Sequence, residues 1–269
     1  MSVEVGLRML LGLVLTLLCG ASAAWAAGTQ TSQPPLRHMT VDLNDQAALR
    51  TGALQVMTRC VSCHGVQGSR YVELAGPLGL TTKQVQRFLD PSGRRLPQTI
   101  VTAMPPQLAK LFFHTVPPDL TVIAKRYSAD WLYTYLTSFY LDPTRPTGVN
   151  NVVVYNVAMP DVFAGLQGLQ SPVKKLGLRF GSRKEVAVGV KPLTAGTMSP
   201  AQFDRTARDI VSFLYLLAHP HQQERHAIGP WILGLFGLLS ALSYALYRLY
   251  WRQVVRPHGP RWWHYWRQR

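Results

Sequence analysis

The residues that could carry chemistry lie together in one short segment, Cys60-Val61-Ser62-Cys63-His64. Two thiols three positions apart on one helical turn can reach the two vinyl groups of a haem and form thioethers with them. A histidine directly after them can bind the haem iron as an axial ligand. The spacing therefore indicates covalent attachment of one haem through Cys60 and Cys63, with His64 as a ligand of the iron.

Three other interpretations of the cysteine pair are weaker. A thioredoxin-like redox pair needs a βαβ context and no following histidine. A zinc site needs about four ligands, and the sequence has no second cysteine pair. A disulfide across two residues is strained. The third cysteine, Cys19, lies in a predicted signal peptide, so Cys60 and Cys63 are the cysteines of the mature chain and a multi-bridge disulfide scaffold is excluded.

The second axial ligand is less well defined by residue type. A methionine there raises the reduction potential and suits electron transfer, and the mature chain offers Met39, Met57, Met104, Met159 and Met198. Met57 lies too close to the motif, on the same predicted helix. Met39 and Met198 are expected to fill space in the core or in the segment that leads into it. Met104 and Met159 each precede a proline that can stiffen a loop, so the residues alone leave both open. Weaker candidates are His38, His114, His219, His221 and His226.

Helices are predicted to carry and surround the motif. Apolar residues recur at helical spacing in residues 45–58, 82–89, 129–141 and 200–218. Residues that can cap these helices are Asn44, Thr81 or Thr82, Ser128 and Ser199. Residues 176–180 and 186–190 flank a basic turn and predict a β-hairpin. The chain is thus mainly α, and its long irregular connections favour a large apolar cofactor as a packing partner.

An uncharged apolar run lies on each side of the haem-binding part of the chain. Residues 9–18 follow Arg8 and precede Ala24-Trp25-Ala26, which predicts a signal peptide over residues 1–26, with cleavage after Ala23 as the alternative. The second run, residues 228–247, would span about 30 Å as a helix at ~1.5 Å per residue, enough to cross a bilayer. We therefore predict four parts: a signal peptide (1–26), a periplasmic haem domain (27–227), a transmembrane anchor (228–250) and a cytoplasmic basic tail (251–269).

The positive charge supports this topology. Of 28 Lys and Arg residues, six arginines lie in the last 22 residues, beyond the apolar run. The positive-inside rule places that tail in the cytoplasm, and its position there favours a membrane-side tail over a groove for nucleic acid. Residues 27–227 carry 21 Lys and Arg against 12 Asp and Glu, a net charge of +9. An electron acceptor of this domain is therefore expected to be neutral or acidic. The alternative is that the positive charge faces anionic lipid headgroups or other subunits.

Several further segments have a recognisable order along the chain. They are Pro117-Pro118-Asp119-Leu120, Trp131-Leu132-Tyr133-Thr134-Tyr135-Leu136-Thr137, Asp142-Pro143-Thr144-Arg145-Pro146-Thr147-Gly148, Asn156-Val157-Ala158-Met159-Pro160 and Thr197-Met198-Ser199. Together with the motif and the anchor they resemble the cytochrome c1 family, over about residues 44–252. The resemblance implies a class I c-type cytochrome-like domain with long haem-wrapping loops, a small β-hairpin and one C-terminal transmembrane helix. It also implies Met159, and not Met104, as the sixth iron ligand, and Arg126 as the partner of a haem propionate.

The function that the resemblance implies is electron transfer within the cytochrome bc1 complex, the quinol–cytochrome c oxidoreductase. The subunit would take one electron from the Rieske iron–sulfur protein, lie beside cytochrome b, and pass the electron to a periplasmic cytochrome c. It would sit in the bacterial inner membrane and would not be catalytic alone. The alternative is a membrane-anchored monohaem cytochrome c that donates to a terminal oxidase. Two other classes are a haem protein with an open coordination site and a haem-bearing assembly or sensor module.

Overall fold

The computed structural model describes residues 34–90, 96–179 and 182–254. The chain separates into two compact units, Met1–Ala218 and His219–Arg269. The first contains the Cys-x-x-Cys-His motif, and the second contains the C-terminal apolar run. The predicted signal peptide and residues 255–269 of the predicted tail lie outside the described residues.

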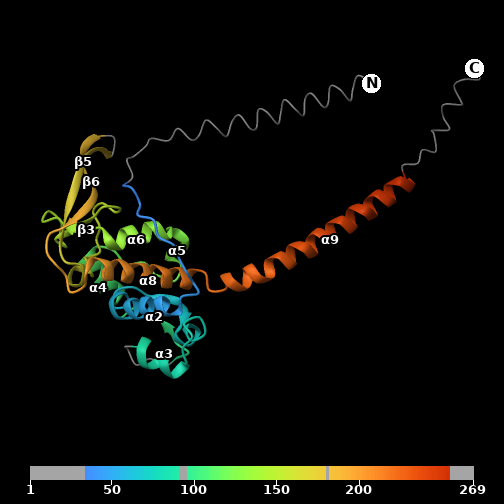
Figure 1. Cartoon of the computed structure of the whole chain (residues 1–269), viewed down its shortest axis with the longest axis horizontal. Helices are drawn as coiled ribbons and strands as arrows, with labels where there is room; N and C mark the ends of the chain where they lie inside the picture. Colours follow the sequence, from blue (N-terminus) through green and yellow to red (C-terminus); the bar gives the residue numbers. More distant parts are fainter. Residues whose placement is uncertain (1–33, 91–95, 180–181, 255–269) are drawn as a thin grey trace, which may run out of the picture. The chain divides into compact units, whose positions relative to one another are not determined.

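Three helices form the centre of the first unit. Helix α8 (Pro200–Ala218) packs against α2 (Gln46–Gln55) and α6 (Ala129–Thr137) (Figure 1). The backbones of α2 and α8 come so close that a Cβ atom on Gly52 would lie 2.0 Å from the carbonyl oxygen of Asp209. A glycine at this position therefore allows the two helices to bury their apolar faces against each other.

Short elements connect these helices. They are the π-helical turn η2 (Val56–Cys60), the 3-10 turn η3 (Tyr71–Leu74) and the helices α3 (Thr82–Leu89), α4 (Pro106–Phe113), α5 (Ile123–Arg126) and α7 (Ala164–Gln167). Antiparallel pairs are formed by β1 (Val66–Arg70) with β2 (Thr99–Ile100), β3 (Phe139–Leu141) with β4 (Val149–Asn151), and β5 (Gln170–Arg179) with β6 (Ser182–Pro192). The first unit is thus mostly helical, as predicted, and of its small two-stranded sheets the predicted one is β5–β6.

The predicted helices are present, and their caps explain their starts. Helix α2 begins after Asp45, whose carboxylate accepts a hydrogen bond from the Ala48 amide at 3.0 Å, so Asp45 is the cap instead of Asn44. Helix α8 begins with a capping box: the Gln202 amide donates to the Ser199 hydroxyl at 3.3 Å, and the Ser199 amide donates to the Gln202 side chain at 2.9 Å. Helix α3 starts after Thr81 in the same way.

The predicted helix over residues 129–141 is too long. Helix α6 ends at Thr137, and residues 139–141 form β3, in register with β4 through the pair Phe139 and Asn151. Phe139 is fully buried and packs with Val149 and Val157. Tertiary packing therefore overrides the helical spacing, because a short apolar run rich in aromatic residues suits a buried strand equally well.

The predicted hairpin is present and longer than expected, as β5 and β6.

A polar cluster ties the segment before α2 to α6 and α8. The Asp204 carboxylate accepts hydrogen bonds from Arg37 at 2.9 Å and Arg208 at 2.8 Å, and from the Tyr133 hydroxyl. Both guanidinium carbons lie 4.6 Å from the centre of the Tyr133 ring, a distance that allows cation–π attraction. The extended segment around Arg37 is therefore bound to the helical core.

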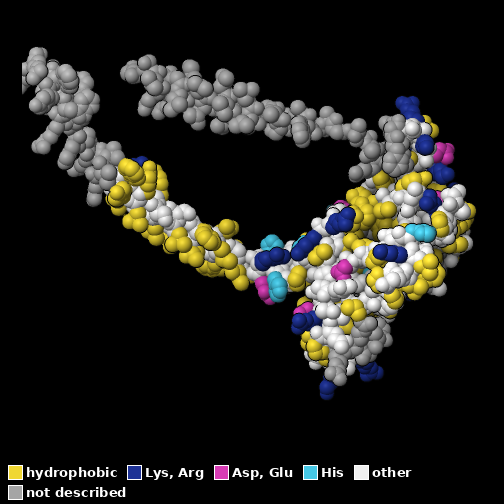
Figure 2. Space-filling model, turned by 180° about the vertical axis from the view of Figure 1, so that it is seen from behind, with side chains coloured by type: hydrophobic (Ala, Val, Ile, Leu, Met, Phe, Trp, Pro, Cys, Tyr) yellow, Lys and Arg dark blue, Asp and Glu magenta, His cyan; other side chains and the backbone are white. Residues whose placement is uncertain are grey.

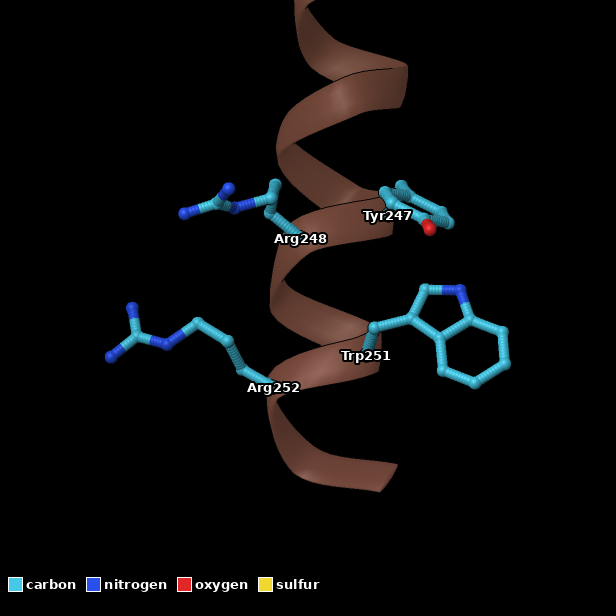
Figure 3. A pocket seen from close by; sticks show the side chains of 4 residues that line it. All are labelled: Tyr247, Arg248, Trp251 and Arg252. Atoms are coloured by element: carbon cyan, nitrogen blue, oxygen red, sulfur yellow. The ribbon is translucent and has the colours of Figure 1, made fainter. Parts of the chain in front are cut away.

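The second unit contains the long helix α9 (Gln222–Val254), with Pro230 inside it. Residues Glu224–Arg252 are long and apolar enough to cross a membrane, and Figure 2 shows hydrophobic side chains covering this helix. Near its C-terminal end Tyr247 and Trp251 project from one side of the helix, while Arg248 and Arg252 project from the other (Figure 3). This end of α9 thus carries the residue types that favour a membrane–water interface.

Candidate functional site

The cysteine–histidine motif begins at the end of a π-helical turn. Helix α2 continues into η2, whose five-residue spacing is closed by the Val61 amide donating to the Val56 carbonyl at 3.1 Å. The amides of Cys63 and His64 then both donate to the Cys60 carbonyl, at 3.0 and 2.8 Å. The two cysteines and His64 therefore lie on one tight turn.

Both cysteines are free and half-buried. Cys60 packs against the main apolar core, and this burial raises the pKa of its thiol to about 12, against the smaller opposite effect of Arg59. The Cys60 side chain is therefore a neutral thiol at physiological pH. Such an S–H group would add across a vinyl double bond of the haem, its sulfur and its hydrogen going to the two vinyl carbons.

His64 is oriented by the main chain of a distant segment. Its Nδ1 atom lies 2.8 Å from the carbonyl oxygen of Pro118. A carbonyl oxygen can only accept, so Nδ1 carries the proton and the lone pair of Nε2 is left for a metal. Burial lowers the pKa of His64, against smaller opposite effects of the Pro118 hydrogen bond and the Asp119 carboxylate. The imidazole is thus held neutral, the state that metal binding requires.

The segment of residues 101–120 is bound to the motif at both of its ends. At the start, the Ala103 amide donates to the Val61 carbonyl at 3.3 Å. At the end, the Leu120 amide donates to the carbonyl of Gly65 at 2.8 Å. The intervening residues, including α4, therefore form a closed loop that begins and ends beside the cysteines and His64.

This loop exposes apolar side chains that the sequence reasoning missed. Helix α4 was not predicted, and the exposed fractions of the large apolar residues in and after it are 41% for Leu108, 70% for Leu111, 63% for Phe112 and 43% for Val116. Residues of this kind are normally buried. An apolar surface on a loop anchored at the motif fits the packing of a large apolar cofactor.

The Met159 thioether is held by a side-chain donor. Its sulfur accepts a hydrogen bond from the hydroxyl of Tyr135, at 3.2 Å, and the half-buried Met159 side chain packs against the cluster around Phe139. The Tyr135 ring stacks on Trp131 with centroids 5.2 Å apart, and Trp131 stacks on Tyr127 at 3.9 Å. A row of aromatic rings, from Tyr127 before α6 to Tyr135 within it, therefore leads to Met159.

Cys60 and Tyr135 pack against the same core cluster, which also contains buried residues of α2, α6 and α8. The structure thereby brings the motif and the neighbour of Met159 to one core. Among the described residues no hydrogen bond joins His64 to Met159 directly. His64 and Met159 are therefore linked indirectly, because their neighbours Cys60 and Tyr135 pack against the same core.

Met104 and Arg126 have different settings. The Met104 amide donates to the Thr102 hydroxyl at 3.1 Å, and its half-buried side chain lies just before α4. Arg126 ends α5 with an exposed side chain, whose guanidinium carbon is 5.5 Å from the centre of the Tyr127 ring. Because Tyr127 begins the aromatic row, Arg126 lies at the end of that row opposite to Tyr135.

These residues fit a covalently bound haem. Two free thiols on one turn, an imidazole with an available Nε2 and an oriented thioether are the donor set of a c-type site with histidine and methionine ligands. In the part of the chain that the structure describes, no group of three or more His, Cys, Asp or Glu side chains could hold another metal ion. The donor set of the site therefore fits haem iron.

Comparison with known proteins decides the family. The cytochrome c1 family matches residues 96–254, which is more than half of the chain. The chain belongs to the cytochrome c1 family. It is 41% identical to cytochrome c1 of Allochromatium vinosum over 219 residues, which are 81% of this chain and 89% of that protein.

Two other relatives extend the similarity. The chain is 34% identical over 249 residues to a protein of Nitrosomonas europaea named ammonia monooxygenase gamma subunit, covering 92% of this chain and all of that one. It is 25% identical over 243 residues to cytochrome c1 of Blastochloris viridis, covering 79% and 83%. Almost the whole chain therefore has counterparts among known proteins.

Membership of the cytochrome c1 family makes the chain an electron-transfer haem protein, and it implies covalently bound haem c. The matched range contains Arg126, Met159 and α9, but it begins after the Cys60–His64 motif. The motif and the family match are therefore separate observations that point to the same cofactor.

Proposed function

We propose that this chain is the c-type haem subunit of a quinol–cytochrome c oxidoreductase, the cytochrome bc1 complex. One haem is attached by thioethers at Cys60 and Cys63, and its iron is bound by His64 and Met159. When bound, the haem supplies one-electron chemistry. The observation that carries the proposal is the attachment motif, with an oriented and neutral His64, in a chain of the cytochrome c1 family.

The ligand pair supports electron transfer instead of ligand binding. A methionine in the sixth position closes the iron and favours the reduced state, and the Met159 sulfur is already oriented by Tyr135. Met104 lacks such a side-chain partner among the described residues. Arg126 is proposed to pair with a haem propionate, because its exposed guanidinium is not engaged by a described carboxylate.

The subunit takes one electron from a Rieske iron–sulfur protein and passes it to a periplasmic cytochrome c, while cytochrome b holds it within the complex. Its residues make and break no substrate bond. They bind the haem, exclude water from it and fix its ligands. The net charge of +9 on residues 27–227 favours a neutral or acidic acceptor.

The proposed topology is a single pass through the bacterial inner membrane. A signal peptide (1–26) exports the haem domain (27–227) to the periplasm, an anchor (228–250) spans the bilayer, and the tail (251–269) stays in the cytoplasm. The apolar α9 and the Tyr, Trp and Arg side chains near its C-terminal end support the anchor (Figure 3).

The proposal is tested by purification of the full-length protein from its native membranes. We expect it to co-purify with cytochrome b and a Rieske protein, and to keep its haem through acid–acetone extraction with a c-type pyridine haemochrome. Replacement of Cys60 and Cys63 by serine should make the haem extractable. Haem that washes out of the unaltered protein would refute covalent attachment, and purification without cytochrome b would refute the complex.

A second candidate comes from the relative named ammonia monooxygenase gamma subunit, all of which is covered by the alignment. Under this second proposal, the same haem domain transfers electrons within an oxygenase instead of a quinol oxidoreductase. The purification separates the two, because an oxygenase would replace cytochrome b and the Rieske protein among the co-purifying subunits. A terminal oxidase in the same place would support the membrane-anchored monohaem alternative.

A further inference from the structure

Two adjacent asparagines are the most buried polar residues in the described part of the chain. Asn150 and Asn151 are 0% and 1% exposed. They end β4, where Asn150 is opposite Tyr140 and Asn151 is opposite Phe139. Burying a side-chain amide is costly unless its donors and acceptors are bonded, so the partners of these two side chains indicate what they hold in place.

Asn151 joins the turn after β4 to α6. Its Oδ1 accepts hydrogen bonds from the amides of Val153 at 2.9 Å and Val154 at 3.3 Å. Its Nδ2 donates to the main-chain carbonyl of Tyr135 at 2.8 Å. One side chain therefore fixes the beginning of the loop and the helix end that it faces.

Asn150 fixes the same loop further along. Its Oδ1 accepts from the amides of Asn151 and Asn156, both at 3.0 Å, and its Nδ2 donates to the Asp142 carboxylate at 2.9 Å. Asn156 has a φ of 59°, and its own side chain accepts a hydrogen bond from Arg145. This left-handed residue lies in a turn, and hydrogen bonds hold both its amide and its side chain.

The pinned loop carries Met159 only three residues after Asn156. Between them, the buried Val157 packs with Phe139 of β3. The hydroxyl that binds the Met159 sulfur belongs to Tyr135, the residue whose carbonyl Asn151 holds. Asn151 therefore bonds to Tyr135, which donates to the Met159 sulfur, and also to the start of the loop that carries Met159.

We infer that Asn150 and Asn151 are positioning residues for the iron ligand Met159, an inference that rests on the proposed role of Met159. Neither asparagine touches the metal. They hold the loop and Tyr135 in one arrangement, so that the thioether needs little further ordering to bind iron. Loosening this arrangement weakens the iron–sulfur bond and lets a small neutral ligand take its place.

The test is CO binding to the ferrous full-length protein in detergent, for the unaltered chain and for Asn151→Ala. The matched control is Gln170→Ala. Gln170 is also a buried amide, 6% exposed, and donates to the Phe139 carbonyl at 2.9 Å, but it does not bond to residues 152–159 in the described structure. We expect Asn151→Ala to raise CO affinity about tenfold, equivalent to about 1.4 kcal/mol. Gln170→Ala should leave CO affinity unchanged.

Further variants separate the possible failures. Asn151→Ser keeps a polar group and should give an intermediate CO affinity; it also replaces Asn151→Ala where the latter does not accumulate. Met159→Ala should bind CO freely and lose the methionine-ligand absorption of the ferric haem. If Met159→Ala leaves that absorption intact, the proposed ligand is wrong. If Met159→Ala opens the iron while both Asn151 variants bind CO no better than Gln170→Ala, the positioning role is wrong and the ligand assignment stands.

Discussion

Replacing Tyr135 by phenylalanine removes the hydroxyl that donates to the Met159 sulfur at 3.2 Å and leaves the ring in its aromatic row. Burial raises the pKa of Tyr135 well above its ordinary value, with a smaller effect from Tyr127. The hydroxyl is therefore protonated, and a donor, at every pH at which the protein works. Its positive end points at the sulfur of Met159, the proposed iron ligand, so it is expected to stabilise the electron-rich reduced site more than the oxidised one.

The size of the effect follows from the net contribution of one such bond, about 1 kcal/mol. For a one-electron couple, about 59 mV corresponds to a tenfold change in the equilibrium, or about 1.4 kcal/mol. Tyr135→Phe should therefore lower the reduction potential by up to about 40 mV. The stacked ring should keep the change in the free energy of unfolding small by comparison, because packing is retained.

Spectroelectrochemical titration of the purified protein measures this shift. Tyr127→Phe is the matched control, since Tyr127 lies in the same row of rings but is stacked on Trp131 and not bonded to Met159. A potential that is unchanged or raised in Tyr135→Phe, with the methionine absorption intact, would contradict the electrostatic argument. A shift of equal size in Tyr127→Phe would assign the effect to the rings instead of the hydroxyl.

Three further predictions concern stability and topology. Burial opposes ionisation of Asp204, but hydrogen bonds, chiefly from Arg208, lower its pKa below the usual value. Asp204→Asn should therefore lower the free energy of unfolding in urea by about 1 kcal/mol at pH 7. This loss should disappear as the pH falls below the pKa of Asp204 in the folded protein. Burial, and then the charge of Asp45, raises the pKa of Asp209 to about 6. The ionised Asp209 carboxylate should therefore destabilise the fold at pH 8 more than at pH 5. In urea unfolding, Asp209→Asn should stabilise the protein by about 1 to 2 kcal/mol at pH 8 and by less at pH 5. Deleting residues 228–269 should yield a haem-bearing domain in the soluble periplasmic fraction, and recovery only in membranes would contradict a single anchor.

The parts of the fold that local sequence determines were predictable. The Ser199 capping box and the Thr81 cap define helix starts through residues three positions apart. The apolar run of α9 identifies a candidate membrane span from length and composition. The attachment motif is also local, because its chemistry depends on five consecutive residues. Each of these signals is complete within one or two helical turns.

The contacts that orient the candidate ligands could not be predicted in this way. The partners of the hydrogen bonds from His64 and Tyr135 are separated from them by 54 and 24 residues. Such contacts depend on how loops close over the core, and a tyrosine at an apolar position of a helix gives no sign of which atom its hydroxyl will meet. The strand at Phe139 was missed for a related reason, since its helical spacing is outweighed by its pairing with β4.

The π-helical turn before the first cysteine bears on how this chain tolerates insertions and deletions. The hydrogen bond from Val61 to Val56 encloses one residue more than an α-helical turn would. Removing one exposed residue there, such as Thr58, would close an ordinary turn and leave Cys60, Cys63 and His64 with nearly the same direction relative to the buried face of α2. A shortened homologue could thus keep its haem, whereas one residue lost between the cysteines would separate them from the two vinyl groups. The chain can therefore lose one residue before Cys60, whereas the number of residues between Cys60 and Cys63 is fixed.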